Sequence, residues 1–304
     1  MHRWCYGKIA KVKFSKINII YNPLSSRDSK TLALGLQTRL QKAITDTEIN
    51  CIPTDHPGHA RELARETALN EDRPLIVSAS GDGGYNEVIN GVMDAGKTRA
   101  VCAVLPAGNA NDHSRAIQKQ PLHKAIAKGS LRHIDLLRVT ITHPDQDPLV
   151  HYAHSYAGLG LTPAMAEMLK DYKQKFAKEF LQIVKMYPKT ESIKIKHLGK
   201  ELELDNLLFA NTYQMAKVLT LSPKTLPNDG MFEVISFPSN HKIKMAQNIV
   251  KAAVSKLKVI QSQRVYRFIL LHDARMQFDG ELIEIKQGSK IVVESAYRAL
   301  TTIV

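Results

Sequence analysis

The chain has little of what would mark a disulfide scaffold, a membrane span or an exported protein. Its 3 cysteines (Cys5, Cys51 and Cys102) are too few and too far apart for a disulfide framework or a zinc-ligand cluster. No run reaches the roughly 18 uninterrupted apolar residues of a membrane-spanning helix. Lysines interrupt the basic N-terminus where a signal peptide would keep its apolar core. These absences together predict a cytoplasmic protein.

Aromatic residues are also scarce, at 6%, and acidic residues are outnumbered: 42 Lys and Arg against 29 Asp and Glu give a net charge of +13. Such an excess favours a polyanionic partner, which is nucleic acid, anionic lipid or nucleotide phosphate. No helix-turn-helix or aromatic RNA-binding signature accompanies it, so nucleic acid is disfavoured. The 44% of hydrophobic residues suffices for a sizeable core, and 304 residues suggest about two domains.

Residues 1–138 alternate short apolar runs with amphipathic stretches. Leucine and isoleucine at a four-residue spacing mark one face of a helix over 29–44, and a second helix is expected over 58–70. This alternation is typical of βαβ units, so we predict a nucleotide-binding α/β domain with a doubly wound, mostly parallel sheet. Its expected strands are 17–21, 49–52, 74–79 and 100–105.

Residues 139–304 instead carry short alternating segments that are separated by turn residues. This pattern is typical of an antiparallel, sandwich-like sheet, and we predict a β-rich substrate-binding domain. Helical insertions are expected near 163–187 and 240–260, and the last ~15 residues are candidates for a return to the first domain. The expected strands are 136–142, 152–156, 192–197, 202–209, 231–236, 264–271, 274–278 and 291–294.

A glycine-rich segment, Ser80–Val88, follows the third strand and opens a helix. Gly81, Gly83 and Gly84 let the backbone approach an anion, and the free amides of a helix N-terminus face it. The segment differs from the dinucleotide fingerprint and from the nucleotide loop that ends in Gly-Lys-Ser/Thr. Phosphate binding is favoured over a plain strand–helix turn in which Asp82 only caps the helix.

A second polar loop, Pro106–Arg115, follows the fourth strand and again leads into a helix. Ligands of parallel sheets bind beyond the carboxyl ends of the strands, so the two loops are expected to form one site. The alternative for Asn111 and Asp112 is that they cap the helix that follows.

Together the two loops resemble the paired signatures of the diacylglycerol kinase-type lipid kinases. That family includes bacterial soluble lipid kinases and sphingosine and ceramide kinases, and it is related in fold to NAD kinases. Its signatures run Gly-Gly-Asp-Gly-Thr-x-Asn-Glu-Val and Pro-x-Gly-Thr-x-Asn-Asp-Phe-Ala-Arg. Further segments match the family in order along nearly the whole chain: Asn22–Pro23, Pro53–Ala60, Leu226–Met231 and Asp279–Glu281.

The resemblance implies a kinase that uses ATP and Mg²⁺ to phosphorylate a lipid hydroxyl, diacylglycerol-like or related. Glu281 would be the general base, Asp82 would handle the magnesium-bound phosphates, and Asp229 would hold a structural Mg²⁺ with the main-chain carbonyls of Leu226 and Met231. From the local sequence alone, Glu281 is a hairpin carboxylate and Asp229 belongs to an Asn-Asp-Gly turn. The implied nucleotide-binding set also contains Asn22, Thr54, Ser80, Gly81, Gly83, Gly84, Asn86 and Asn109, supported by Glu87, Asn111 and Asp112.

Several positions depart from the signatures. Ser80 replaces a glycine, Gly84 and Asn109 each replace a threonine, and His113 with Ser114 replaces Phe-Ala. Losing a hydroxyl that bonds to a charged group costs about 1.5–3 kcal/mol. The alternative is therefore a catalytically weak or inactive relative that binds nucleotide or lipid. The acidic residues assigned to chemistry are all present, which favours an active kinase.

Two further features stay open. His151 and His154, with His143 nearby, have no carboxylate or cysteine close in sequence, and residues three apart on one strand face opposite sides, so a zinc site is not expected. The lysine-rich stretches 170–189 and 242–258 fit solvated helix faces and peripheral contact with an anionic membrane equally well. An exposed edge strand would allow a homodimer.

Overall fold

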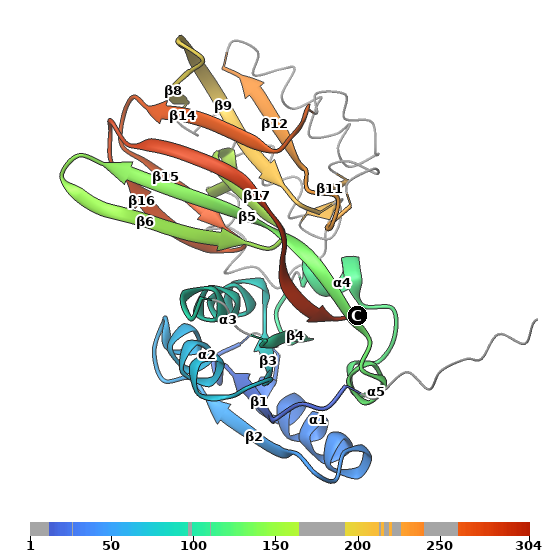
Figure 1. Ribbon diagram of the computed structural model, residues 1–304. Coiled ribbons are helices and arrows are strands. Elements are labelled where there is room, and N and C mark those ends of the chain that lie inside the picture. Colours follow the sequence, from blue (N-terminus) through green and yellow to red (C-terminus); the bar gives the residue numbers. More distant parts are fainter. Residues whose placement is uncertain are drawn as a thin grey trace, which may run out of the picture.

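The computed structural model describes residues 12–25, 27–96, 99–109, 111–163, 192–212, 214–215, 219–220, 226–239 and 261–304 (Figure 1). Both lysine-rich stretches, and nearly all of the two expected helical insertions, lie outside these residues. Within the described ranges, no helix is long and apolar enough to cross a bilayer.

The first half of the chain forms a parallel sheet in the order β2-β1-β3-β4. All six residues of β3 are buried, including Ser78 and Ser80 at its end, as expected for a central strand that is covered on both faces. This confirms the predicted doubly wound α/β architecture. The strands are β1 (Lys16–Tyr21), β2 (Glu48–Pro53), β3 (Leu75–Ser80) and β4 (Val101–Pro106).

Helices α1 and α5 cover one face of this sheet and α2 and α3 the other, and these helices, α4 and β1–β4 form what we call the α/β half. Leu36 and Leu40 of α1 and Leu122 of α5 pack on one face, whereas Ala64 of α2 and Ile89 of α3 pack on the other. The apolar stripe of each helix therefore matches one buried face of the sheet. The helices are α1 (Ser29–Ala43), α2 (His59–Asn70), α3 (Asp82–Asp94), α4 (Asp112–Ile117) and α5 (Leu122–Lys128).

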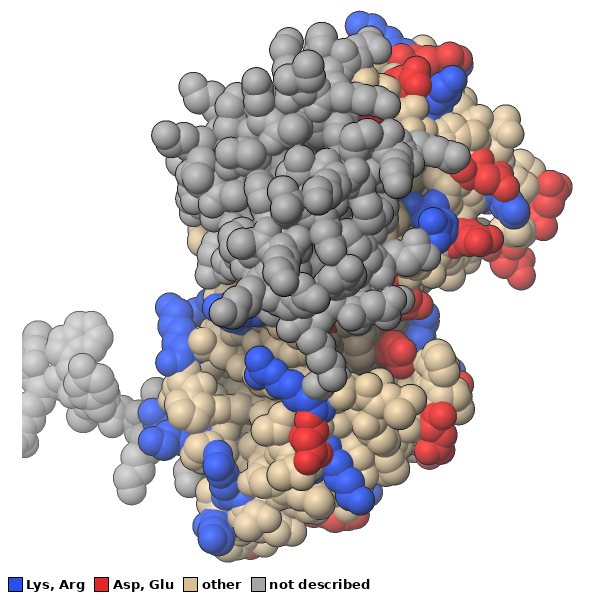
Figure 2. Space-filling model, turned by 180° about the vertical axis from the view of Figure 1, so that it is seen from behind, with Lys and Arg blue, Asp and Glu red and all other residues tan. Residues whose placement is uncertain are grey.

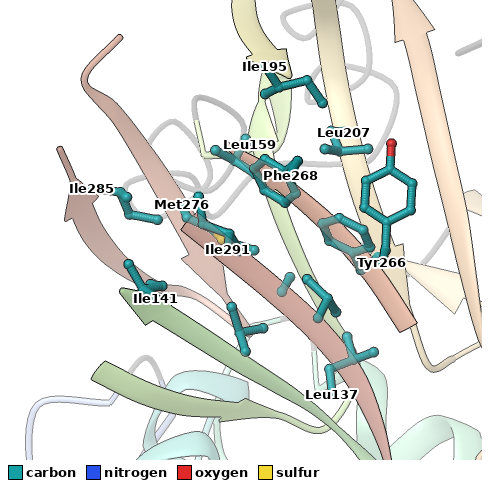
Figure 3. Packing of buried hydrophobic residues seen from close by; sticks show 14 of the residues in the cluster. Leu137, Ile141, Leu159, Ile195, Leu207, Tyr266, Phe268, Met276, Ile285 and Ile291 are labelled. Atoms are coloured by element: carbon teal, nitrogen blue, oxygen red, sulfur yellow. The ribbon is translucent and has the colours of Figure 1, made fainter. Parts of the chain in front are cut away.

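The described residues from Leu131 onward, the β-rich half, form a curled antiparallel sheet, as predicted. Its strands surround one cluster of buried side chains, including Leu137, Phe268 and Ile291 (Figure 3). The strands are β5 (Leu131–His143), β6 (Gln146–Ala153), β7 (Tyr156–Gly160), β8 (Ile193–His197), β9 (Lys200–Ala210), β12 (Phe232–Pro238), β13 (Gln261–Gln263), β14 (Val265–Leu270), β15 (Ala274–Phe278), β16 (Glu281–Ile285) and β17 (Lys290–Ile303), with β10 (Gln214–Met215) and β11 (Leu219–Thr220) paired separately.

Strand β17 joins the two halves (Figure 1). Its first residues pair antiparallel with β5 and β14, and Thr302 near its end pairs parallel with Cys102 of β4. The register shifts between Ala296 and Leu300, where the buried carboxylate of Asp135 accepts the amides of Gly230 and Arg298 at 2.6 and 2.7 Å. All the described strands except β10 and β11 therefore form one 15-stranded sheet across both halves.

One expected strand is wrong. A single strand was expected over 152–156, but β6 ends at Ala153 and β7 begins at Tyr156. The chain breaks there because the amides of His154, Ser155 and Tyr156 all donate to the buried carboxylate of Asp279, at 2.6–3.0 Å. That carboxylate lies more than a hundred residues away in sequence, so no local pattern reveals the break.

Figure 2 shows one face of the molecule, on which charged side chains are dispersed. Lys and Arg are scattered over the α/β half and are interspersed with Asp and Glu over the β-rich half. The two lysine-rich stretches, on which the predicted contact with an anionic membrane is based, lie outside the described residues.

Candidate active site

The two polar loops of the α/β half meet backbone to backbone. A Cβ placed on Gly81 would lie 3.2 Å from the Cα of Gly108, and a Cβ on Gly108 would overlap the Cα of Gly81. Asn111 fixes the second loop, because its side-chain amide accepts from the Gly108 N–H at 3.0 Å and donates to the Gly108 carbonyl at 2.6 Å. Only glycine at positions 81 and 108 allows the loops to approach this closely.

Asp82 bridges the two loops. The N-cap residue of α3 is Gly81, so Asp82 does not cap its own helix. Instead, the Asp82 carboxylate accepts hydrogen bonds from the amides of Asp112 and His113 at the start of α4, at 3.2 and 3.3 Å. Burial, followed by the charge of Asp112, raises the pKa of Asp82 to about 7. The side chain thus holds the second loop against the first, a role that neither sequence interpretation contained.

A pocket of about 220 Å³ opens at the carboxyl ends of β1 and β3. Five of the expected nucleotide-binding and supporting residues line it: Asn22, Thr54, Ser80, Gly84 and Glu87. Asn109 is exposed on the second loop and is not among the lining residues that the structure describes. The pocket borders the glycine-rich segment through Ser80 and Gly84, whereas Gly81, Asp82 and Gly83 are not among the residues that line it.

Two departures from the family signature compensate for each other in this pocket. Position 80 gains a hydroxyl that the signature lacks, and position 84 loses the one that it has. A Cβ on Gly84 would lie 2.5 Å from the Ser80 hydroxyl oxygen, so the Ser80 side chain occupies that space. Its hydroxyl lies 2.7 Å from Ser78 Oγ and donates to the Gly81 carbonyl at 3.0 Å. The pocket thus keeps a hydroxyl in an altered position.

The β15–β16 hairpin brings the distant carboxylate of Glu281 to this site. Asp279 and Gly280 form its two-residue turn, with φ values of 49° and 106°. A Cβ on Gly280 would lie 3.8 Å from the backbone of Gly83, so the turn packs directly on the glycine-rich segment. The hairpin expected from the Asp-Gly pair is therefore present, and it places Glu281 beside α3 of the other half.

The Glu281 side chain is 40% exposed and lies among charged groups from several elements. Burial raises its pKa, the nearby Glu87 and Asp279 raise it further, and Arg61 on α2 opposes them. A raised pKa brings a carboxyl group closer to the proton affinity that general base catalysis at neutral pH requires. Glu87 also lines the pocket, so a charge at the pocket wall acts on Glu281.

Asp279 is a central residue to which the sequence assigned no role. It is 1% exposed, and besides the three amides around His154 it accepts from Asn86 Nδ2 of α3 at 3.0 Å. Burial raises its pKa to about 7 despite these donors. Asp279 therefore ties the hairpin turn, the break between β6 and β7, and α3 together at one point.

Three buried histidines surround these acids. His154 Nε2 lies 3.4 Å from Asp279 Oδ2, His151 Nε2 lies 3.4 Å from Glu281 Oε2, and the His113 ring packs 4.6 Å from the His154 ring. Burial lowers the pKa of His151 to about 4 and of His154 to about 3, so both are neutral at pH 7. The sequence interpretation, which saw no carboxylate near these histidines, missed contacts that only the fold creates.

The segment assigned to a structural Mg²⁺ lies beside the β17 irregularity. Asp229 is exposed and its Oδ1 accepts the Met231 amide at 3.0 Å, as in the turn that the sequence predicts. The Asp135 amide donates to the neighbouring Pro227 carbonyl at 2.7 Å. An exposed carboxylate next to main-chain carbonyls supplies the oxygen donors that Mg²⁺ prefers, so the chemistry of these residues fits this ion.

Comparisons with known proteins agree with the geometry. The family model of the diacylglycerol kinase catalytic domain matches residues 16–139. A diacylglycerol kinase of Bacillus subtilis (strain 168) is 32% identical over 235 residues, which cover 72% of this chain and 73% of that protein. One of Staphylococcus aureus (strain bovine RF122 / ET3-1) is 25% identical over 283 residues, covering 88% and 86%. The crystal structure of a diacylglycerol kinase from Bacillus anthracis str. Sterne shares the fold, with a TM-score of 0.72, 19% identity and coverage of 96% and 98%.

Proposed function

The chain belongs to the diacylglycerol kinase family, and from this membership we propose that it transfers the terminal phosphoryl group of ATP to the hydroxyl of a lipid. The observation that carries the proposal is the packing of the Gly280 turn on Gly83 of the glycine-rich segment. This contact joins the two halves at the point where a phosphate loop and a half-buried carboxylate, Glu281, are both needed.

Phosphoryl transfer depends on positioning and charge neutralisation more than on covalent chemistry. In this proposal the pocket lined by Asn22, Thr54 and Ser80 receives the nucleotide, and the backbone amides at the start of α3 face its phosphates. Asp82 keeps the second loop in place through the α4 amides. The donor is thus held mainly by backbone groups of the α/β half.

Glu281 is proposed to take the proton from the acceptor hydroxyl. Its carboxyl group is partly exposed, and its pKa is raised by burial and by Glu87 and Asp279, so its basicity is higher than that of a solvated glutamate. The raised pKa also means that activity rises with pH as Glu281 loses its proton. One Mg²⁺ ion would neutralise charge on the nucleotide phosphates. A second, structural Mg²⁺ ion would be held by Asp229 together with the main-chain carbonyls of Leu226 and Met231.

We test this with magnesium-dependent transfer of labelled phosphate from ATP to a panel of diacylglycerol, a sphingoid base and phosphatidylglycerol. Glu281→Gln is expected to slow the transfer about 100- to 10,000-fold, because it removes the base. Glu284→Gln, an exposed carboxylate on the same strand, is the matched control and should leave the rate unchanged. Full activity of Glu281→Gln would contradict the assignment of the base.

A catalytically weak or inactive binding protein is the second candidate. The observation that favours it is that both Asp82 oxygens already accept amide hydrogen bonds from α4, and that Gly84 lacks the hydroxyl of the signature. Tight ATP binding in calorimetry without transfer to any acceptor of the panel would support this candidate over the kinase.

Two partner assignments complete the proposal. A lipid acceptor implies peripheral contact with an anionic membrane through stretches 170–189 and 242–258, and sedimentation with vesicles that contain phosphatidylglycerol tests this contact. A homodimer through an edge strand is tested by sedimentation equilibrium of the full chain.

A further inference from the structure

A small cavity lies where α4 meets the β-rich half. Its volume is about 30 Å³, and the described residues that line it come from both halves of the molecule. No acid, lysine or arginine is among these residues, so the wall presents dipoles and apolar surface. Helix α4 contributes His113, Ala116 and Ile117, and the β-rich half contributes His154, Asn211, Thr212 and Pro227.

Three polar atoms of this wall have no hydrogen-bond partner within the part of the chain that the structure describes. They are His113 Nε2 on α4, and Asn211 Oδ1 and Thr212 Oγ1 just beyond β9. The three residues are 3%, 2% and 5% exposed, so these atoms are shielded from bulk water. Leaving a buried polar atom unpaired is costly, and three such atoms around one small space indicate a shared partner.

The other contacts of Asn211 fix the orientation of its side chain. Its Nδ2 atom donates to the Asp135 carbonyl at 2.8 Å and to the His154 carbonyl at 3.3 Å, so Oδ1 is the atom left without a partner. An amide oxygen only accepts, and the shared partner must therefore bring a hydrogen to Asn211.

The other two atoms can each donate or accept. Burial, followed by the nearby His154, lowers the pKa of His113 well below its usual value. The ring is therefore neutral at pH 7, and its Nε2 atom carries either a hydrogen or a lone pair. The Thr212 hydroxyl is likewise both donor and acceptor. The partner that suits all three atoms donates to Asn211 and takes whichever role the other two leave to it.

We propose that the cavity is a binding site for one water molecule, through which His113 holds the second polar loop against the β-rich half. Water both donates and accepts, and a buried water in a protein typically makes about three hydrogen bonds. A cavity of about 30 Å³ accommodates a water molecule but no larger ligand. An anion has no hydrogen for Asn211, and a divalent cation would lack the carboxylate oxygens that it prefers.

The water gives the second polar loop a second attachment. The first is the Asp82 carboxylate, which accepts the amides of Asp112 and His113 and ties the loop to the glycine-rich segment. The water ties His113 to the segment after β9, where the Asn211 amide donates to the Ser155 carbonyl at 2.7 Å. The phenylalanine of the family signature would bring no polar atom to the cavity, so the link depends on the histidine of this chain.

A crystal structure of the full chain, at a resolution that shows ordered water, tests the site directly. We expect a water oxygen at about 2.7–3.2 Å from His113 Nε2, Asn211 Oδ1 and Thr212 Oγ1. Absence of a water that bonds to His113 and to at least one of the other two atoms would overturn the proposal. Contacts of about 2.0–2.6 Å would identify a metal ion instead and would also overturn it.

Hydrogen exchange tests the link between the halves in solution. Thr212→Val keeps the shape of the side chain but removes the hydroxyl, whereas Thr212→Ser keeps the hydroxyl. Because the water connects Thr212 to α4 of the other half, Thr212→Val should speed the exchange of α4 amides about 3- to 10-fold, and Thr212→Ser less than about twofold. Unchanged exchange in α4 of a folded Thr212→Val protein would contradict the link.

The matched pair at position 113 tests the same water from the side of α4. His113→Phe removes the polar atom and should lower the melting temperature by about 3–8 °C, since Asn211 and Thr212 lose their shared partner. His113→Gln keeps a polar group and should recover most of this loss. His133→Phe, at an exposed histidine on β5, is the control and should leave the melting temperature unchanged. Equal melting temperatures of His113→Phe and wild type would overturn the proposal. Absence of phosphoryl transfer by the wild-type chain would instead contradict the proposed function alone.

Discussion

The two sides of the candidate site are built by different means. In the α/β half, the loops at Gly81 and Gly108 are held by backbone contacts and by glycines at the ends of neighbouring strands. In the β-rich half, Glu281 is placed by a buried carboxylate, Asp279, which gathers amides from a chain break and a side chain from α3. The nucleotide side thus depends on a close backbone approach at two glycines, which the side chains of Asp82 and Asn111 fix, whereas the position of Glu281 depends on one buried carboxylate.

The largest effect should come from the β-rich side. Asp279→Ala leaves three buried amides without their acceptor and removes one of the two acceptors of Asn86 Nδ2, so the free energy of unfolding should fall by about 3–5 kcal/mol in urea denaturation. Asp147→Ala, an exposed position on β6, serves as the control and should change stability by less than about 0.5 kcal/mol. Equal stability of the two variants would show that Asp279 does not organise this side.

On the nucleotide side, an added methyl group at Gly108 should reduce both stability and ATP binding. Gly108→Ala places a Cβ where the Cα of Gly81 lies, and backbone cannot move aside cheaply, so we expect a loss of about 3 kcal/mol together with weaker ATP binding. Gly35→Ala is the control, because a Cβ there meets nothing within 4 Å. Unimpaired ATP binding by Gly108→Ala in calorimetry would mean that the two loops are not in contact.

The buried histidines make the β-rich side sensitive to acid. Burial lowers the pKa of His154 from 6.5 to about 3, so the native state excludes a proton that the unfolded state binds below pH 6.5. Stability from this residue is present above pH 6.5 and is lost as the pH falls, by about 2 kcal/mol at pH 5. Compared with wild type, His154→Asn should therefore lose about 2 kcal/mol less between pH 7.5 and pH 5 in urea denaturation.

The smallest effect should come from positions 80 and 84, where Ser80 carries a hydroxyl that the family signature places at position 84. Gly84→Thr alone should push the Ser80 side chain from its place, costing about 1 kcal/mol and weakening ATP binding. The double variant Ser80→Gly, Gly84→Thr restores the family arrangement and should recover both losses. Additive losses in the double variant, measured by calorimetry and denaturation, would show that the two positions do not compensate.

The local sequence predicted the nucleotide side of the site, in the α/β half, well. The four parallel strands and the loops at Ser80–Val88 and Pro106–Arg115 follow from apolar runs, glycines and strand ends, which are all legible within about ten residues. The role of Asp82 was not predictable, because its hydrogen bonds go to α4 rather than to its own helix. Asp279, His151 and His154 act through partners that are distant in sequence, and nothing in the local pattern reveals them.

The two longest strands were predicted too short. Strands 136–142 and 291–294 were expected to be short, but β5 and β17 extend to Leu131 and Ile303 because they pair with each other along most of their length. Their ends alternate less clearly, since they pass from the curled sheet into the parallel one. Pairing between elements, not local propensity, determines where these strands end.

The shared strand β17 has a consequence for synthesis of the chain on the ribosome. Cys102 of β4 and its partner Thr302 are 200 residues apart, so the outer edge of β4 stays uncovered while the entire β-rich half is being made. An uncovered strand edge is a site for wrong pairing and aggregation. The sheet of the nucleotide half is therefore complete only when the last residues of β17 have been made.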